Sequence, residues 1–188
     1  MTIEEIFKTI NNRLIEGEMV HAQMAEFWDF FGYLNGFKRQ QEYRMFSEIL
    51  DRRKLNRWFI NHYNTLIPED LPENPSIIPP AFTTQTRDTL NGNAKSYIKA
   101  GIEKWYTWEK DTLALYQTLY REAMYIDDVE GAMYIEKLID GVSEEYTKVC
   151  RLWLKCKALD YEVPQIIDFQ DEMHKYYKKK CAKLRIKL

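Results

Sequence analysis

The sequence predicts an all-α protein: a four-helix bundle made of two antiparallel hairpins joined by a long crossover, with one more helix at the C-terminus. Three observations support this prediction: long segments with helical periodicity, very short connections within each pair of segments, and a proline-rich stretch between the pairs. No segment alternates as a strand does, and no repeat of fixed period is present. At 188 residues we expect residues 1–188 to form a single domain.

Five stretches of the chain show the spacing of three, four or seven between apolar side chains that marks one face of a helix. The first two stretches end at turn signals, Asn35-Gly36 and Pro68. Asp127-Asp128 supplies an N-cap region for the fourth helix, and Pro164 opens the last one. The helices are expected over residues 3–34, 37–66, 94–125, 128–159 and 164–184.

The connections between these helices decide the topology. Only about two residues join the first helix to the second, and the third to the fourth, so each pair is antiparallel. Residues 68–93, between the pairs, hold five of the six prolines and have the composition of an extended crossover. A helix of about 30 residues is roughly 45 Å long, and about 14 extended residues cover that distance. The crossover is therefore long enough to run the length of the bundle.

The composition excludes several classes of protein. With 27 basic and 29 acidic residues the formal charge is -2, which shows no overall bias toward nucleic acid or an anionic membrane. No window approaches the roughly 18 apolar residues of a membrane helix, and no export signal is visible. The cysteines, Cys150, Cys156 and Cys181, lack metal-finger or redox spacing, so we expect reduced thiols. These features predict a soluble cytoplasmic protein.

Each of the four long predicted helices carries an acidic residue near its middle, and three of these acids interrupt an apolar stripe. They are Glu18, Asp51, Glu109 and Glu145, and His21 follows Glu18 by one turn on the same face. In a four-helix bundle such positions converge at a similar height in the interior. A buried carboxylate without a partner is costly, so each must be protonated, paired with a cation or bound to a metal.

The same segments resemble classical ferritins over roughly residues 10–150. The resemblance runs from Ile15-Glu16-Gly17-Glu18 to Lys54-Leu55-Asn56-Arg57-Trp58-Phe59, and from Glu109 through Leu119-Tyr120-Arg121-Glu122-Ala123 and Asp128 to Tyr134-Ile135-Glu136-Lys137-Leu138-Ile139 and Glu144-Glu145. Without gaps, Glu18 and Glu109 take the places of two family glutamates, and the E-x-x-H motif of helix two falls on Asp51-Arg52-Arg53-Lys54. The resemblance implies a ferritin-like bundle with a di-iron ferroxidase centre, in which carboxylates and a histidine bind two Fe(II) ions before the oxidised iron is stored in a hollow shell.

Three positions depart from the family's pattern. Lys54 replaces the histidine of E-x-x-H and is protonated at neutral pH, Asp51 is shorter than glutamate, and Val142 cannot ligate a metal. In the favoured interpretation Lys54, helped by Arg52 or Arg53, is a buried counter-ion, and the acids are a structural remnant without metal. Two other interpretations stay open: a single weakly bound cation at Glu18, Glu109 and His21, and a working di-iron site.

The sequence therefore predicts a ferritin-like protein with a degenerate metal centre, acting as a homo-oligomeric or interaction scaffold without ferroxidase activity and with no cofactor expected. Its aromatic content of 14% is enough for a core and a subunit interface. The first alternative is an iron-binding ferritin-type oxidase or storage protein, with iron or another divalent metal at Glu18, Asp51, Glu109, Glu145 and His21. The second is a nucleic-acid-associated protein using the basic residues 175–187, which would otherwise simply complement the dipole of a helix C-terminus.

Overall fold

Five helices, and no strand, make up residues 1–68 and 92–185, the part of the chain that the computed structural model describes. They are α1 (Ile3–Phe31), α2 (Asn35–Tyr63), α5 (Ala94–Tyr125), α6 (Val129–Ala158) and α7 (Val163–Arg185). The all-α prediction is confirmed, and each helix covers most of the range expected for it. Most of the expected crossover over 68–93 lies outside the described residues, because these exclude 69–91 and 186–188.

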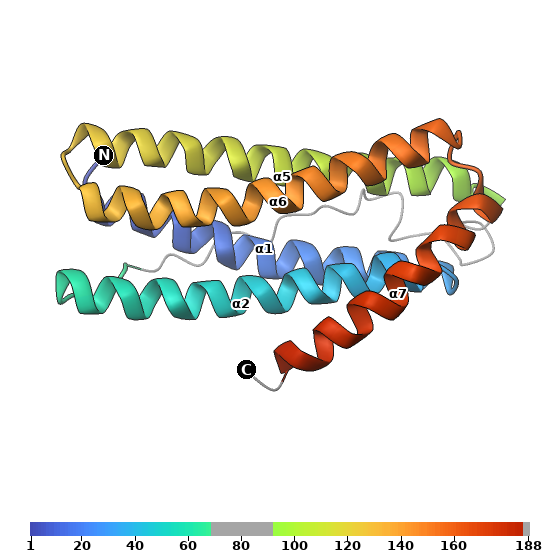
Figure 1. The fold of residues 1–188 in the computed structure, drawn as a ribbon, viewed down its shortest axis with the longest axis horizontal. Coiled ribbons are helices and arrows are strands. Elements are labelled where there is room, and N and C mark those ends of the chain that lie inside the picture. Colours follow the sequence, from blue (N-terminus) through green and yellow to red (C-terminus); the bar gives the residue numbers. More distant parts are fainter. Residues whose placement is uncertain (69–91, 186–188) are drawn as a thin grey trace.

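The helices form two hairpins that lie side by side, α1 with α2 and α5 with α6 (Figure 1). α2 ends at one end of the bundle and α5 begins at the other, as a crossover along the bundle requires (Figure 1). α7 leaves the end of α6 and packs obliquely across α2. This is the predicted four-helix bundle with an additional C-terminal helix. No helix within residues 1–68 or 92–185 has an apolar stretch long enough to cross a membrane.

Local chemistry sets where the helices begin and end. α1 begins with a capping box, in which the side chains of Thr2 and Glu5 each accept a hydrogen bond from the other residue's backbone amide. It ends because Gly32 adopts the left-handed conformation, with φ of 75°. α2 ends in the same way at Asn64, with φ of 54°. Both helices therefore stop earlier than residues 34 and 66, because the prediction relied on turn signals further along the chain.

Two apolar clusters fill the interior, one toward each end of the bundle. One is built around Trp28, Phe37 and Trp105, and the other around Phe7 and Phe59. On α2, α5 and α6, a buried polar or charged side chain lies between the residues of the two clusters, and on α1 the buried His21 directly follows Val20, the first α1 residue of the cluster around Trp28. The interior is therefore divided by a polar layer at mid-length, and this layer contains the candidate site.

A close contact holds α7 against the turn between α1 and α2. The Nε2 of Gln170 donates to the backbone oxygen of Tyr33 at 2.8 Å, and its Oε1 accepts a hydrogen bond from the Gly36 amide. A Cβ at residue 36 would lie 2.1 Å from the backbone oxygen of Gln170. The approach of α7 to α2 therefore requires glycine at this position.

Candidate metal centre

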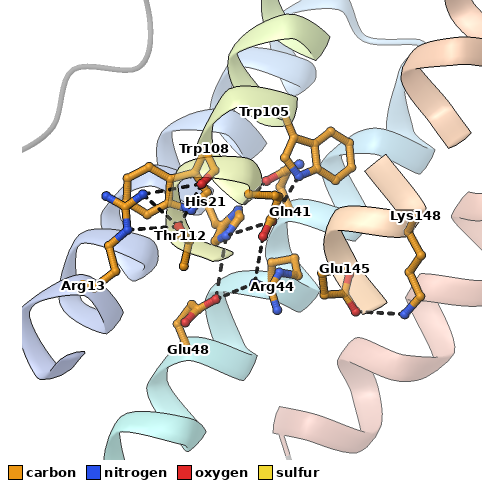
Figure 2. Close-up of polar contacts among 11 residues, drawn as sticks. Arg13, His21, Gln41, Arg44, Glu48, Trp105, Trp108, Thr112, Glu145 and Lys148 are labelled. Carbon is orange, nitrogen blue, oxygen red and sulfur yellow. Dashed lines mark hydrogen bonds and ion pairs between the residues drawn. The ribbon is translucent and has the colours of Figure 1, made fainter. Parts of the chain in front are cut away.

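A buried acidic or histidine side chain from each bundle helix reaches the polar layer: His21 of α1, Glu48 of α2, Glu109 of α5 and Glu145 of α6. Figure 2 shows His21, Glu48 and Glu145 of this set. All four are buried, with exposed fractions from 0% for His21 to 8% for Glu48 and Glu145. Arg44 lies one turn before Glu48 on α2 and is 7% exposed. The layer thus brings three carboxylates, one imidazole and one guanidinium together inside the bundle.

Arg44 joins two of the carboxylates (Figure 2). Its Nη2 donates to Glu48 Oε1 at 2.7 Å and lies 3.4 Å from Glu109 Oε2. Burial disfavours the charged guanidinium, but Glu109 and Glu48 outweigh this effect and raise the pKa of Arg44 above its ordinary value. Arg44 is therefore a fixed positive charge at the centre of the layer, and its charge-assisted hydrogen bonds orient both glutamates.

His21 is neutral at physiological pH. Burial, with Arg44 nearby, lowers its pKa to about 3. Its Nδ1 lies 2.7 Å from the Gln41 Oε1, which can only accept, so Nδ1 carries the hydrogen and Nε2 the lone pair. That Nε2 has no hydrogen-bond partner among residues 1–68 and 92–185, and it lies 3.8 Å from Glu109 Oε1 and 3.9 Å from Glu48 Oε1.

The charges of the layer nearly balance. Burial raises the pKa of Glu48 to about 7, against the lowering effect of Arg44, so Glu48 exchanges its proton near neutral pH. Glu145 accepts a hydrogen bond from Lys148 Nζ at 2.8 Å through Oε1, while its Oε2 has no hydrogen-bond partner in the described part of the chain. When Glu48 is protonated, Arg44 and Lys148 match the carboxylates of Glu109 and Glu145.

A cavity of about 550 Å³ between α2 and α6 connects the layer with the surface. The buried Arg44, Glu48 and Glu145 line it, together with the exposed Lys54 and Lys137. A small ion can therefore reach the carboxylates from solvent.

No family model matches the sequence, and neither does any curated protein. Two solved structures are similar along almost the whole length. One is an engineered closed form of the Archaeoglobus fulgidus ferritin, with 16% identity and a TM-score of 0.73 over 93% of this chain and 96% of that chain. The other is a humanized archaeal ferritin, with 16% identity and a TM-score of 0.69 over 93% and 97%. The chain has the ferritin-like fold. At this level of identity the likeness extends to the fold alone.

In this ferritin-like bundle the predicted site residues divide into two groups. His21, Glu109 and Glu145 lie in the polar layer. Glu109 and Glu145 were expected there because each interrupts an apolar stripe, and His21 because it follows Glu18 by one turn. Glu18 lies outside it and accepts a hydrogen bond from Arg52 Nε at 2.7 Å, in a partly exposed pair. Asp51 is 38% exposed in its side chain and is paired at 2.7 Å with Lys54.

The prediction that Lys54 is the buried counter-ion is wrong, because its side chain is 69% exposed. Six positions after Glu48 on an α-helix is a rotation of roughly 240°, which turns Lys54 away from the interior. Arg44 occupies the interior position instead. On α1, Gly17 rather than Glu18 faces Glu48, since a Cβ at Gly17 would lie 3.1 Å from Glu48 Cγ.

The sequence contained a signal for the residues that were missed. Glu48 lies seven residues before the buried Leu55, and Arg44 lies four residues before Glu48. These steps place both residues on the same helical face as Leu55. The ungapped comparison with the ferritin motif placed the glutamate of E-x-x-H at Asp51, three residues after Glu48. The prediction therefore overlooked Glu48 and Arg44.

The residues of the layer do not fit a metal ion as they are arranged. No group of three or more His, Cys, Asp or Glu side chains within residues 1–68 and 92–185 has the spacing of a metal site. The Glu48 oxygen that faces His21 Nε2 is the one already bonded to Arg44. A guanidinium cannot act as a ligand, and its positive charge repels a cation.

Proposed function

We propose that this chain is a ferritin-like assembly protein that does not oxidise iron, because an arginine takes the place of metal ions among its interior carboxylates. The observation that best supports this is the position of Arg44, 2.7 Å from Glu48 Oε1 and 3.4 Å from Glu109 Oε2. A metal ion between these glutamates would have to displace a permanently charged group from the same oxygens. The centre is degenerate in this proposal, and its ion pairs have a structural role.

Exposed apolar side chains support the assembly role. Five large ones lie around the turn between α5 and α6, and we call them the apolar cap: Met124, Tyr125, Ile126, Val129 and Met133. Tyr125 is 86% exposed, and Val129 and Met133 are each 55% exposed. Clusters of this kind mark protein–protein contacts more often than isolated apolar residues do. The partner we propose is a second copy of the chain.

The metal half of the proposal is tested by removing Arg44 and adding a divalent cation. Arg44→Ala leaves Glu48 and Glu109 facing His21 without their cation, so we expect Co²⁺ to raise the melting temperature of this variant and to give visible absorption. The wild-type chain should show neither effect, and with Fe(II) in air it should produce ferric absorbance no faster than a protein-free solution does. Arg52→Ala is the matched control, since it removes an arginine of α2 outside the layer.

Two results would contradict this half of the proposal. One is Co²⁺ binding by the wild-type chain, or ferric absorbance that rises faster than in protein-free solution, if it disappears in Glu109→Ala. The other is an Arg44→Ala variant that is folded, as judged by circular dichroism, but does not bind Co²⁺. Arg44 would then not be the group that excludes the metal.

A second candidate function is the binding of one divalent cation, and His21 favours it. Its lone pair on Nε2 has no hydrogen-bond partner and is close to two carboxylates, which are also metal ligands. Movement of Arg44 into the cavity would open such a site. Co²⁺ binding by the wild-type chain that is lost in His21→Ala supports this candidate. Nucleic-acid binding through residues 175–187 stays a prediction, supported by the basic side chains of that segment alone.

A further inference from the structure

A second cavity, of about 500 Å³, lies between α6 and α7, beside α2 and away from the apolar cap. We call it the α6–α7 groove. One of its sides is basic and the other is apolar. Neither the fold nor the proposed function explains this combination, and the inference below does not depend on the proposed function.

The basic side belongs to α6. Lys148, Arg151 and Lys155 line the groove, and their spacing of three and four places them on one helical face. Residues 146–158 contain four basic side chains and no acidic one. Lys148 is paired with Glu144 and Glu145, at 2.7 and 2.8 Å. Within the described part of the chain no acidic side chain pairs with Arg151 or Lys155, so their charges face the groove without a counter-ion.

The apolar side belongs to α7. Phe169, Met173 and Tyr177 line it, and the Lys155 ammonium lies 4.1 Å from the centre of the Phe169 ring. This contact places a cation directly beside apolar surface. A ligand in the groove could therefore contact a positive charge and an apolar side chain that lie next to each other.

Gln40 of α2 supplies an independent sign of a missing ligand. It lines the groove, it is 3% exposed, and its Oε1 has no hydrogen-bond partner among the residues that the structure describes. Buried amide oxygens are rarely left unsatisfied. Rotating the side-chain amide of Gln40 by 180° exchanges its Oε1 and its NH₂ group. In that orientation Gln40 donates a hydrogen bond to an anion in the groove.

We propose that the α6–α7 groove binds an anionic amphiphile, a single carboxylate or phosphate group attached to an apolar body. Arg151 and Lys155 pair with the head group, Gln40 donates to it, and the apolar body lies against Phe169 and Met173. A polyanion fits less well because Glu172 lines the same groove and Asp168 and Asp171 flank it on α7. The groove thus favours one localised negative charge next to an apolar chain.

The test is calorimetric titration of the full chain with decanoate and with decyl phosphate, both below the concentration at which they form micelles. We expect saturable binding of at least one of them, and the comparison distinguishes a carboxylate from a phosphate ligand. Arg151→Gln combined with Lys155→Gln should weaken binding at least tenfold. Lys104→Gln combined with Lys110→Gln makes the same charge change on exposed positions of α5 and should leave binding unchanged.

Decyltrimethylammonium separates a charge-selective site from general apolar binding, and we expect it not to bind. Equal binding of this cation, or equal weakening by both double variants, would overturn the proposal. So would the absence of binding by both anions. Binding of a single-stranded oligonucleotide in place of the amphiphiles would also overturn it and would assign the basic face to nucleic acid.

Discussion

Among single residues, Arg44 and His21 govern what the polar layer can hold. Arg44 supplies a positive charge that hydrogen-bonds to Glu48 and lies beside Glu109. His21 stays neutral because burial lowers its pKa to about 3, so it adds no second charge at physiological pH. The layer therefore depends on one guanidinium, and we expect its loss to leave both Glu48 and Glu109 without a positively charged partner.

Replacing Arg44 by Met should strongly destabilise the protein. The change keeps an apolar side chain of similar length but leaves Glu48 and Glu109 buried without their cation, a situation that typically costs about 3–5 kcal/mol. Urea unfolding at pH 7 measures the loss. Arg52→Met breaks the partly exposed pair with Glu18, and we expect it to cost less than about 1 kcal/mol. Equal losses in the two variants would show that Arg44 has no special role.

Glu48 should make stability depend on pH in a defined window. Because burial raises its pKa to about 7 in the folded chain from an ordinary value of 4.5, Glu48 keeps its proton to a higher pH in the folded state than in the unfolded state. Its contribution to stability therefore falls as pH rises from about 4.5 to about 7. Glu48→Gln cannot ionise, so its stability relative to wild type should rise across this window, by on the order of 1–3 kcal/mol.

The difference between the two unfolding free energies, measured at several pH values, checks this prediction. Taking a difference removes the opposite contribution of His21, whose lowered pKa makes stability rise between about pH 3 and 6.5 in both proteins. A difference that stays constant from pH 4 to about 8 would contradict the buried position of an ionising Glu48.

The sequence allowed some of these residues to be predicted but not their pairing. Glu109 and Glu145 were expected inside because each interrupts a stripe of apolar residues, and they are buried. His21 was expected inside because it follows Glu18 by one turn on the same face, and it is buried although Glu18 is partly exposed. Lys54 was expected inside because of its place in a family motif, and it is exposed. The rotation of a helix decides which of two nearby charges faces inward, and a motif comparison at low identity does not fix that rotation.

Among the helices, α7 shows how one glycine permits a contact. Its Gln170 bonds to the backbone of the α1–α2 turn only because Gly36 has no Cβ. The sequence predicted that this helix exists, from Pro164 at its first turn, but not that it crosses α2. Docking depends on contacts between segments more than 130 positions apart, and local periodicity does not report them.

Gly36→Ala should loosen α7 from α2. The new Cβ would lie 2.1 Å from the backbone oxygen of Gln170, and backbone cannot yield as a flexible side chain does. We expect a loss on the order of 1–3 kcal/mol and faster proteolysis within α7. Gly141→Ala is the control, because a Cβ there meets nothing within 4 Å, and we expect it to stabilise α6 by about 0.5–1 kcal/mol.

For the whole molecule, the fold was predictable because its helices and its two hairpins are determined by local features of the sequence. Helix periodicity and connection lengths depend on residues close in sequence, and they gave the helix order and the hairpins correctly. The single-domain boundary, cytoplasmic location and homo-oligomeric state stay predictions, because each depends on something outside the described helices.

Assembly through the apolar cap can be tested with one substitution. Tyr125→Asp places a charge on its most exposed residue, so we expect the mass measured by light scattering to fall from a multiple of the chain mass toward a single chain. Leu154→Asp makes the same change at a residue of α6 that is 56% exposed and outside the cap, and should leave the mass unchanged. A wild-type chain that is already monomeric would refute the assembly role.

The central claim is that the Arg44 guanidinium fills the space among the interior carboxylates. The most direct measurement is a crystal structure of the wild-type chain soaked anaerobically in Fe(II), with anomalous scattering recorded at the iron edge. We predict no iron peak between Glu48 and Glu109, with Arg44 hydrogen-bonded to Glu48. An iron peak within bonding distance of these glutamates and His21, with Arg44 turned into the cavity, would contradict the account.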